Sequence, residues 1–457
     1  EDTGLYLKFQ DGVNLTLTIL LTSTAIVYAA GLLMRRWSRY DKYVLGISIT
    51  ANLGLILVFK YAGFISVNLQ ALSGYLHISH PIGEVKLLMP IGISFYIFKS
   101  VSYIIDVYRK KIEPQRHFGI FALYVSFFPQ LLAGPIERST TFLPQVTKQF
   151  SYDYQRITDG LKIMAWGFFK KLVIADRLAL YVDKVFASPA SIEGLSLLLA
   201  AYFFTIQIYC DFSGYSDIAI GSAKILGYEG MDNFRRPYFS KTMQEFWSRW
   251  HISLSTWFRD YLYIPLGGNR VSAARRYFNV MAVFLLSGLW HGANWTFVVW
   301  GGVHGAFLLF SHATMPVRTR LKQGIFRIIG AEKNGTIKAA ADSIMSLWSI
   351  IVTFNLAAFA WIFFKADSLT KAADFIKNMF KWNLGNIMVG FSFYDFLLMI
   401  LSILMLVLLD FIQEHDKCRH PFTQKKDLMR WGLYYVVVLS IVFFGVFEQS
   451  KFIYFNF

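Results

Sequence analysis

The feature that most limits how this chain can fold is a series of apolar runs long enough to cross a lipid bilayer. A helix that crosses about 30 Å of hydrocarbon needs roughly 20 mostly apolar residues. Runs of about this length lie at 15–34, 43–67, 195–209, 344–364, 396–412 and 431–447. Weaker candidates, interrupted by Gly, Pro or single charges, lie at about 87–107, 118–136, 160–182, 278–292 and 294–312. The pattern predicts an all-α polytopic membrane protein with about ten or eleven transmembrane or re-entrant helices in a single membrane domain, residues 1–457.

The composition agrees with a lipid environment. Of 457 residues, 55% are hydrophobic and 16% are charged, whereas a soluble domain has about 25% charged residues. The net charge of +16 does not indicate nucleic acid, because the basic residues cluster in short gaps between apolar runs, as in cytoplasmic loops. The segments expected on the cytoplasmic side are 35–42, 108–116, 224–276, 318–338 and 417–426. The gap at 69–85 has no Lys or Arg and is expected outside, while the crossing pattern of 135–185 stays open.

The two cysteines and the N-terminus say less. Cys210 lies in an apolar run and Cys418 in a basic loop, so neither a disulfide framework nor a metal-ligand spacing is present, and we expect no metal. The chain begins with Glu1, and its first residues have neither the basic start nor the apolar centre of a signal peptide. We therefore expect a longer natural N-terminus.

A long polar interruption at about 224–277 contains an amphipathic pattern over 241–270. Phe246, Trp250 and Leu254 recur at helical spacing, which predicts an amphipathic helix that lies in the membrane interface or packs under the bundle. Anchoring explains most of its residues. His251 is the exception, because it borders the apolar face, where an imidazole is neither a good anchor nor a good core residue.

Two further segments place polar groups beside apolar runs. Asp211 and Asp217 follow the run at 195–209, and a carboxylate at membrane depth needs either a function or a close partner. Pairing, for example with an arginine from 235–259, and chemistry remain equal alternatives. The segment 129–145 contains three prolines, so its irregular backbone is expected to line a cavity or to be satisfied by loop packing.

The segment SGLWHGANWTFVVWGGVHG, residues 287–305, contains two histidines. The apolar pieces on either side of Gly292–Asn294 are short and have basic flanks, which predicts a hairpin with His291 near its tip. At this depth an imidazole is expected to stay neutral, and a neutral imidazole can accept a proton. Trp290 and Asn294 lie beside it and can orient a ligand, whereas His304 is expected to be a packing or hydrogen-bonding residue.

Two of these segments together resemble a known family. FWSRWHISLSTWFRDYLYIPLGG (246–268) and LSGLWHGANWTFVVWG (286–301) are similar to the paired motifs of the membrane-bound O-acyltransferases, and specifically of the bacterial alginate O-acetyltransferase branch. The segments 209–221, 233–238 and 131–138 also match that branch. The resemblance is strong over 87–312, which we expect to be the catalytic core. Chains of this branch usually begin with further hydrophobic segments, which agrees with an incomplete N-terminus.

The resemblance implies a helical bundle that passes an acyl group from a cytosolic thioester through the membrane. The invariant histidine of the family matches His291, as a base or a transient acyl carrier, and the second motif histidine matches His251. Trp290, Asn294 and Asp211 are then candidates for binding substrate. The implied donor is acetyl-CoA, whose phosphates would suit a basic face of the chain. The arginines expected there are Arg235, Arg236, Arg249 and Arg259.

The function implied is O-acetylation of an extracytoplasmic polysaccharide by an enzyme of the bacterial inner membrane. Alginate is the favoured polysaccharide, with peptidoglycan or cellulose as alternatives, and a separate periplasmic or surface partner of the SGNH-hydrolase type is expected to complete the transfer. A D-alanyl transferase with a carrier-protein thioester is the related alternative. A transporter that uses Asp211, Asp217, His251 and His291, and a non-catalytic scaffold, are the alternatives of other classes.

Overall fold

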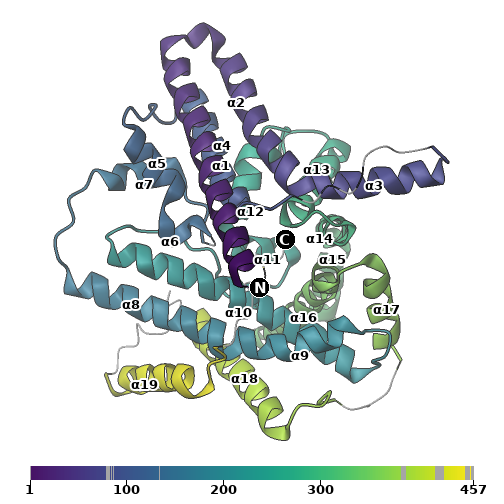
Figure 1. The fold of residues 1–457 in the computed structure, drawn as a ribbon. Helices are drawn as coiled ribbons and strands as arrows, with labels where there is room; N and C mark the ends of the chain where they lie inside the picture. Colours follow the sequence, from purple (N-terminus) through teal and green to yellow (C-terminus); the bar gives the residue numbers. More distant parts are fainter. Residues whose placement is uncertain are drawn as a thin grey trace. The chain divides into compact units, whose positions relative to one another are not determined.

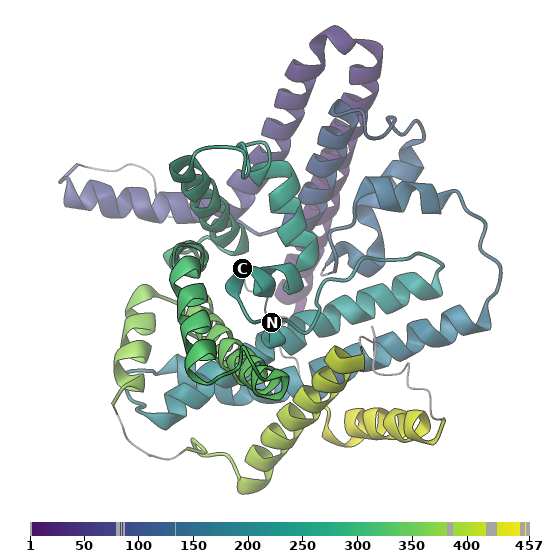
Figure 2. The same ribbon diagram turned by 180° about the vertical axis from the view of Figure 1, so that it is seen from behind.

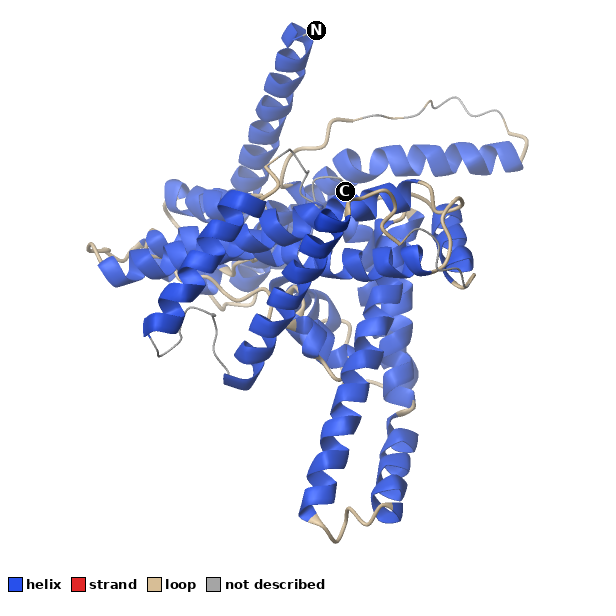
Figure 3. Ribbon diagram, turned by 90° about the horizontal axis from the view of Figure 1, so that it is seen from below, coloured by secondary structure: helices blue, strands red, loops and turns tan. Residues whose placement is uncertain are grey.

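The computed structural model of the chain describes residues 2–78, 83, 85, 87–132, 134–381, 387–416, 427–447 and 453. All regular secondary structure in these residues is helical, as Figure 3 shows. The all-α prediction is therefore confirmed. The expected cytoplasmic segment 417–426, with Cys418, lies outside the described residues.

Six helical stretches in the described part of the chain are long and apolar enough to cross a membrane. They are Gly12–Arg36 in α1 (Asp2–Arg36), Ser38–Tyr75, α10 (Leu195–Ile225), α14 (Trp295–Ala313), Gly335–Lys365, which is α16, and Phe393–His415 in α18 (Phe393–Asp416). On α18 the side chains of Leu401, Leu404 and Leu408 are at least half exposed, at 50%, 58% and 58%. Exposed leucines three or four residues apart form a stripe suited to lipid. The prediction of a multi-pass membrane protein is confirmed.

The weaker apolar segments differ in the structure: the one at 294–312 forms α14, one of the six stretches, whereas the one at 118–136 is interrupted. The run at 118–136 is divided into α5 (Phe118–Ser126) and α6 (Phe128–Leu131), because Pro129 stands at the start of the second helix. The irregular stretch that follows leads to α7 (Ser139–Val146). Its buried Glu137 accepts hydrogen bonds from Met231 N at 2.8 Å and from the Gln130 amide at 3.3 Å. Protein groups therefore satisfy the carboxylate of this segment, which favours the loop-packing alternative.

The described residues group into two compact units, of which one consists of the chain up to Met164 and of Ile218–Met231. In this unit α1 packs against α2 (Asp41–Ile56) and α4 (Ile93–Tyr108), as Figure 1 shows. The same unit holds α3 (Ala62–Tyr75) and most of α8 (Tyr154–Phe168). Helix α4 is buried over most of its length, so it forms the core of this unit.

The other unit consists of Ala165–Asp217 and Asp232–Ile453 and contains both motif histidines. Its centre is the hairpin of α13 (Ala273–His291) and α14, against which α16 (Gly335–Lys365) packs; the green helices of Figure 2 show it from behind. The hairpin predicted from the sequence is thus present, with His291 as the last residue of α13. The same unit also holds α9 (Asp176–Ala187), α15 (Met315–Ile328), α17 (Leu369–Met379), α18 and α19 (Asp427–Phe444).

The predicted amphipathic helix over 241–270 is interrupted in the structure. It forms α11 (Met243–Arg249) and α12 (Ile252–Phe258), followed by the π-helical turn η5 (Arg259–Tyr263). The interruption lies at His251, whose φ of 42° is left-handed and cannot continue a right-handed helix. The apolar side chains Phe246, Trp250 and Leu254 are buried, and α11 contacts α14 and α16. The face predicted from the periodicity is therefore covered by protein, as in the packed alternative.

The two hairpin helices touch through glycines. A Cβ atom at Gly288 would come within 2.2 Å of Phe297 O, and one at Gly301 within 2.2 Å of Phe284 O. Real Cβ atoms do not approach backbone this closely, so only glycine allows this spacing. Close backbone approach is how helices associate where lipid supplies no hydrophobic driving force. Gly288 and Gly301 therefore set the separation of α13 and α14.

We predict that Gly301→Ala lowers the thermal unfolding temperature of the detergent-solubilised protein, with a destabilisation of about 1–3 kcal/mol from overpacking. Gly302→Ala is the matched control, because its Cβ would meet Leu285 at an ordinary 3.6 Å. Both changes improve helix propensity equally. Equal unfolding temperatures for the two variants, measured by intrinsic fluorescence, would contradict the close packing at Gly301.

Candidate active site

His291 lies where the hairpin turns, in a shell of aromatic rings. Its side chain is 3% exposed. The ring is edge-on to Trp290 and Trp300, each at 4.9 Å between centroids, and to Phe364 at 5.3 Å. Such edge-to-face contacts are favourable and fix the ring plane. His291 is therefore held rigidly, out of bulk water.

Asn294 fixes the turn that follows His291. Its side-chain oxygen accepts from Thr296 N at 3.1 Å and caps α14, and its amide nitrogen donates to Asp367 O at 2.9 Å. An asparagine at the N-cap satisfies a backbone donor that has no partner within the helix. The structure thus gives Asn294 a role in shaping the site. Its predicted contact with substrate stays a prediction.

His251 is also fully buried, at the break between α11 and α12. Its Nδ1 lies 3.1 Å from Asn233 Oδ1, and its ring stands perpendicular to Phe212 at 4.5 Å. Burial lowers the pKa of His251 from 6.5 to about 3 because the imidazolium would lose its hydration. His251 is therefore neutral at physiological pH.

Trp290 lies between the two motif histidines. Its ring centroid is 6.2 Å from that of His251 and 4.9 Å from that of His291. Residues forty positions apart in the sequence therefore share one indole neighbour. The structure brings together His251, Trp290 and His291, three of the residues that the sequence singled out.

His304 belongs to the aromatic packing behind this group. It is fully buried, one turn after Trp300, and its ring lies 4.9 Å from Trp300 and 5.0 Å from Trp247. Within the described part of the chain, neither of its ring nitrogens has a hydrogen-bond partner. Its surroundings are those of the packing residue that the sequence predicted.

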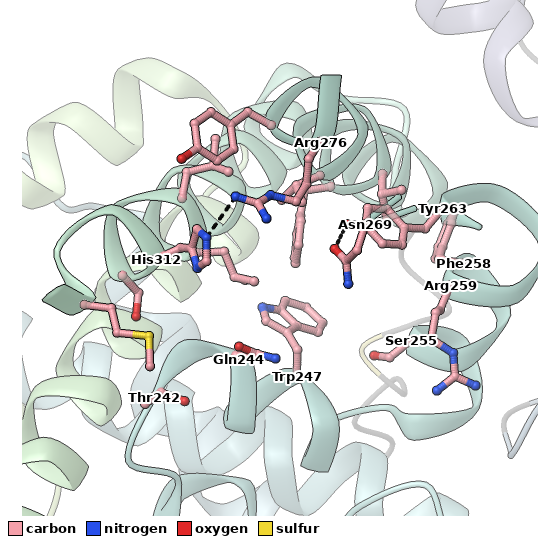
Figure 4. Close-up of a pocket in the computed structure, with 18 of the residues that line it drawn as sticks. Thr242, Gln244, Trp247, Ser255, Phe258, Arg259, Tyr263, Asn269, Arg276 and His312 are labelled. Carbon is pink, nitrogen blue, oxygen red and sulfur yellow. Dashed lines mark hydrogen bonds between the residues drawn. The ribbon is translucent and has the colours of Figure 1, made fainter. Parts of the chain in front are cut away.

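A cavity of about 820 Å³ opens beside the hairpin, lined by α11, α12, η5, α13, α14 and α15 (Figure 4). One face of α13 lines it through Val280, Val283, Phe284 and Ser287, which are three or four residues apart. His291 follows Ser287 by four residues, a rise of about 6 Å on the same face of the helix. The cavity lining on α13 thus ends at Ser287, one helical turn before His291.

The rim of this cavity is cationic. Its positively charged lining residues are Arg259, Arg276, Arg318 and Lys322. Lys322 pairs with Asp342 at 2.7 Å and Arg259 with Asp260 at 2.8 Å. Arg276 is 3.0 Å from His312 Nε2, a bond drawn in Figure 4, and Arg318 donates to Ser311. Among the described residues no carboxylate forms an ion pair with Arg276 or Arg318, so both charges remain available for an anion.

The arginines predicted to face donor phosphates lie in different surroundings in the structure. Arg259 lines the cavity. Arg249 binds Glu245 at 2.7 Å and Glu414 at 2.9 Å, and Arg236 binds Glu414 at 2.7 Å. The carboxylates already balance these two charges. Sequence reasoning missed Arg276 and Arg318, although their positions at the two basic flanks of the hairpin were the available signal.

The carboxylates of α10 have internal partners. Lys171 contacts Asp211 at 2.6 Å and Asp176 at 2.7 Å, and Lys170 contacts Asp217 at 2.5 Å. Asp211 also accepts from Ile453 N at 3.0 Å. The partners are lysines of the π-helical segment η3 (Phe169–Ala175), not arginines from 235–259. The two lysines that interrupt the apolar run at 160–182 are thus the counter-ions of α10.

Sequence comparison identifies the family of this chain. Residues 16–330, more than half of the chain, match the membrane-bound O-acyltransferase family. This chain belongs to the membrane-bound O-acyltransferase family. The resemblance carried by the two histidine motifs is confirmed.

Among its relatives, a probable alginate O-acetylase AlgI of Azotobacter vinelandii is 39% identical over 347 residues, 75% of this chain and 64% of the relative. The protein of the same name from Pseudomonas putida is 39% identical over 364 residues, 79% of this chain and 69% of the relative. A peptidoglycan O-acetyltransferase of Helicobacter pylori is 34% identical over 370 residues, 74% of this chain and 65% of the relative. The chain thus matches about two thirds of the length of these relatives.

We predict that Lys171→Met destabilises the protein by about 3–5 kcal/mol, because it leaves two buried carboxylates without their cation. Lys381→Met is the matched control: Lys381 pairs with Glu193 at 2.8 Å, but its side chain is 49% exposed, and such pairs contribute about 0–1 kcal/mol. Thermal unfolding in detergent measures both. A Lys171→Met variant as stable as Lys381→Met would show that the buried pair does not support the fold.

Proposed function

We propose that this chain is a membrane O-acetyltransferase that passes acetyl groups from a thioester donor to an extracytoplasmic polysaccharide. The observation that carries the proposal is the pair of buried motif histidines, His251 and His291, which share Trp290 as a neighbour. The names of the similar proteins, an alginate O-acetylase and a peptidoglycan O-acetyltransferase, support acetyl as the group and a polysaccharide as the acceptor.

The proposed chemistry is attack of a hydroxyl oxygen on the thioester carbonyl. A base takes the hydroxyl proton as the new C–O bond forms, the C–S bond breaks, and the thiolate leaves with the proton. His291, held among aromatic rings, takes the part of the base or of a transient acyl carrier. The dry surroundings strengthen any hydrogen bond to the developing oxyanion.

Acetyl-CoA is the donor that we propose, and the cavity supports it. Its volume of about 820 Å³ lies within the usual range of ligand pockets, about 300–1,000 Å³. The free charges of Arg276 and Arg318 at the rim suit phosphate groups, and the apolar walls suit the pantetheine arm. The thioester would then extend past Ser287 toward His291.

The acceptor and the partner follow from the same proposal. Alginate is the first candidate, and peptidoglycan and cellulose are the others. We propose that the protein resides in the bacterial inner membrane and hands the acetyl group to a periplasmic or surface protein of the SGNH-hydrolase type. The described part of the chain is helical and contributes the membrane portion of such a system.

A D-alanyl transferase is the second candidate, favoured by 28% identity over 303 residues, 62% of this chain and 69% of the relative, to a teichoic acid D-alanyltransferase of Streptococcus thermophilus. The thioester donor of such an enzyme would be a carrier protein, which lacks the nucleotide of coenzyme A.

The transporter alternative has less support in the structure. Buried lysines already neutralise Asp211 and Asp217, so these carboxylates favour a transporter less than their depth implied.

We predict that His291→Ala lowers acetyl transfer by about 100-fold or more, because proton transfer contributes at least this much. The purified protein, reconstituted with labelled acetyl-CoA and alginate oligomers, provides the assay. His415→Ala, a change at an exposed histidine of α18, is the control for expression and insertion. Equal rates for His291→Ala and the parent would rule out the catalytic role and leave the scaffold alternative.

We predict that Arg276→Gln and Arg318→Gln each raise the KM for acetyl-CoA by about 10- to 100-fold, the equivalent of one charged hydrogen bond. Arg320→Gln is the matched control, because Arg320 is exposed on α15 but does not line the cavity. Acetyl-phosphopantetheine, which lacks the nucleotide, is the second donor in this assay. An unchanged KM in both cavity variants would place the donor elsewhere.

A further inference from the structure

Asn233, in the segment NFRRPY, holds the turn that carries His251. It is 1% exposed. Its Oδ1 faces three groups: His251 Nδ1 at 3.1 Å, Ser253 N at 3.3 Å and Ser253 Oγ at 2.9 Å. Its Nδ2 donates to Ser216 Oγ at 3.0 Å. One buried amide therefore connects α10, the His251 turn and α12.

These contacts determine which way the Asn233 amide faces. A backbone N–H can only donate, so the atom of Asn233 that faces Ser253 N must be the oxygen. The amide nitrogen then faces Ser216 Oγ, which accepts. Since His251 Nδ1 faces the same oxygen, it must carry the hydrogen. In a neutral imidazole the other nitrogen, Nε2, then carries the lone pair.

The contact between His251 and Asn233 is accompanied by a strained backbone conformation at His251. Its φ of 42° lies in the left-handed region, which costs about 1–2 kcal/mol for a residue with a Cβ. Two backbone hydrogen bonds hold the segment around Asn233 against the segment around His251. Ile252 N donates to Asn233 O and Arg235 N donates to Arg249 O, both at 2.9 Å. Strain of this kind persists where the surroundings over-determine it, and it concentrates at functional sites.

We propose that Asn233 is a positioning residue that fixes His251 in the Nδ1–H tautomer, so that Nε2 acts as a hydrogen-bond acceptor and base toward the attacking hydroxyl. The inference rests on the proposed function. His291 then takes its other part, that of the transient acyl carrier. The hydroxyl oxygen attacks the acetyl carbon held on the His291 nitrogen, and the hydroxyl proton moves to Nε2 of His251 as the C–O bond forms. The released His291 nitrogen takes that proton as the C–N bond breaks. A neutral His251 in this tautomer has no donor on Nε2, so it does not stabilise the oxyanion.

The tautomer is measured directly in the resting protein. In the parent labelled with 15N-histidine, the His251 signal is identified by its loss in His251→Gln. We expect a protonated Nδ1 and an unprotonated Nε2. A protonated Nε2 with a bare Nδ1 overturns the proposal. This measurement needs no turnover, so it tests the tautomer even if the proposed acetyl transfer fails.

Variants of Asn233 test its effect on the reaction. Asn233→Leu removes the acceptor, and we expect kcat to fall by about 100-fold while the KM for the donor stays within about threefold, because the cavity is untouched. Asn233→Asp keeps an acceptor oxygen for Nδ1–H and is expected to restore kcat to within about tenfold of the parent, with the tautomer unchanged.

Ser253→Ala is the matched control, because it removes one hydrogen bond to the same oxygen but leaves the contact with His251. We expect its kcat to stay within about threefold of the parent. A loss as large in Ser253→Ala as in Asn233→Leu indicates general damage to the turn and overturns the positioning role. If Asn233→Leu does not fold, the Asn233→Asp variant decides instead. Loss of the His251 Nδ1–H signal in Asn233→Asp also overturns the positioning role.

Discussion

The close approach of α13 to α14 is the constraint on which the site depends. Gly288 and Gly301 leave no room for a Cβ against the facing backbone, so the two helices lie in direct contact along the hairpin. His291 ends the first helix and Trp300 lies in the second, and the narrow spacing presses their rings together at 4.9 Å. Bulkier residues at the two glycines would separate the helices and open the aromatic shell to water.

Several buried or half-buried charges of this membrane protein have an opposite charge beside them. Lys170 and Lys171 neutralise the carboxylates of α10, and Arg249 shares Glu245 and Glu414. Arg276 and Arg318 on the rim of the cavity have no carboxylate partner among the described residues. Unpaired cations beside an apolar cavity are where an anionic ligand gains most, because its charge completes the pairing.

Periodicity and motif spacing predicted much of this molecule. Five of the six strong apolar runs located helices long enough to cross a membrane, because hydrocarbon requires about 20 apolar residues in any helix that crosses it. The sixth run, at 431–447, overlaps a shorter apolar helix, Arg430–Phe444. The short pieces around Gly292 predicted the hairpin and the place of His291 at its tip. The amphipathic periodicity over 241–270 marked the buried side chains, yet it did not reveal the interruption at His251. That interruption depends on hydrogen bonds to Asn233, eighteen residues earlier in the sequence.

The sequence by itself determined that the chain is a helical membrane protein, which family it belongs to and which two histidines to examine. These conclusions depend on local composition and on motifs, both of which can be recognised along the sequence without knowledge of the fold. Only the tertiary structure decided that Trp290 links the histidines, that lysines rather than arginines pair with Asp211, and that Arg276 and Arg318 face the cavity. Which charge meets which partner depends on helix packing between distant segments, and that packing is not encoded in the spacing of any single motif.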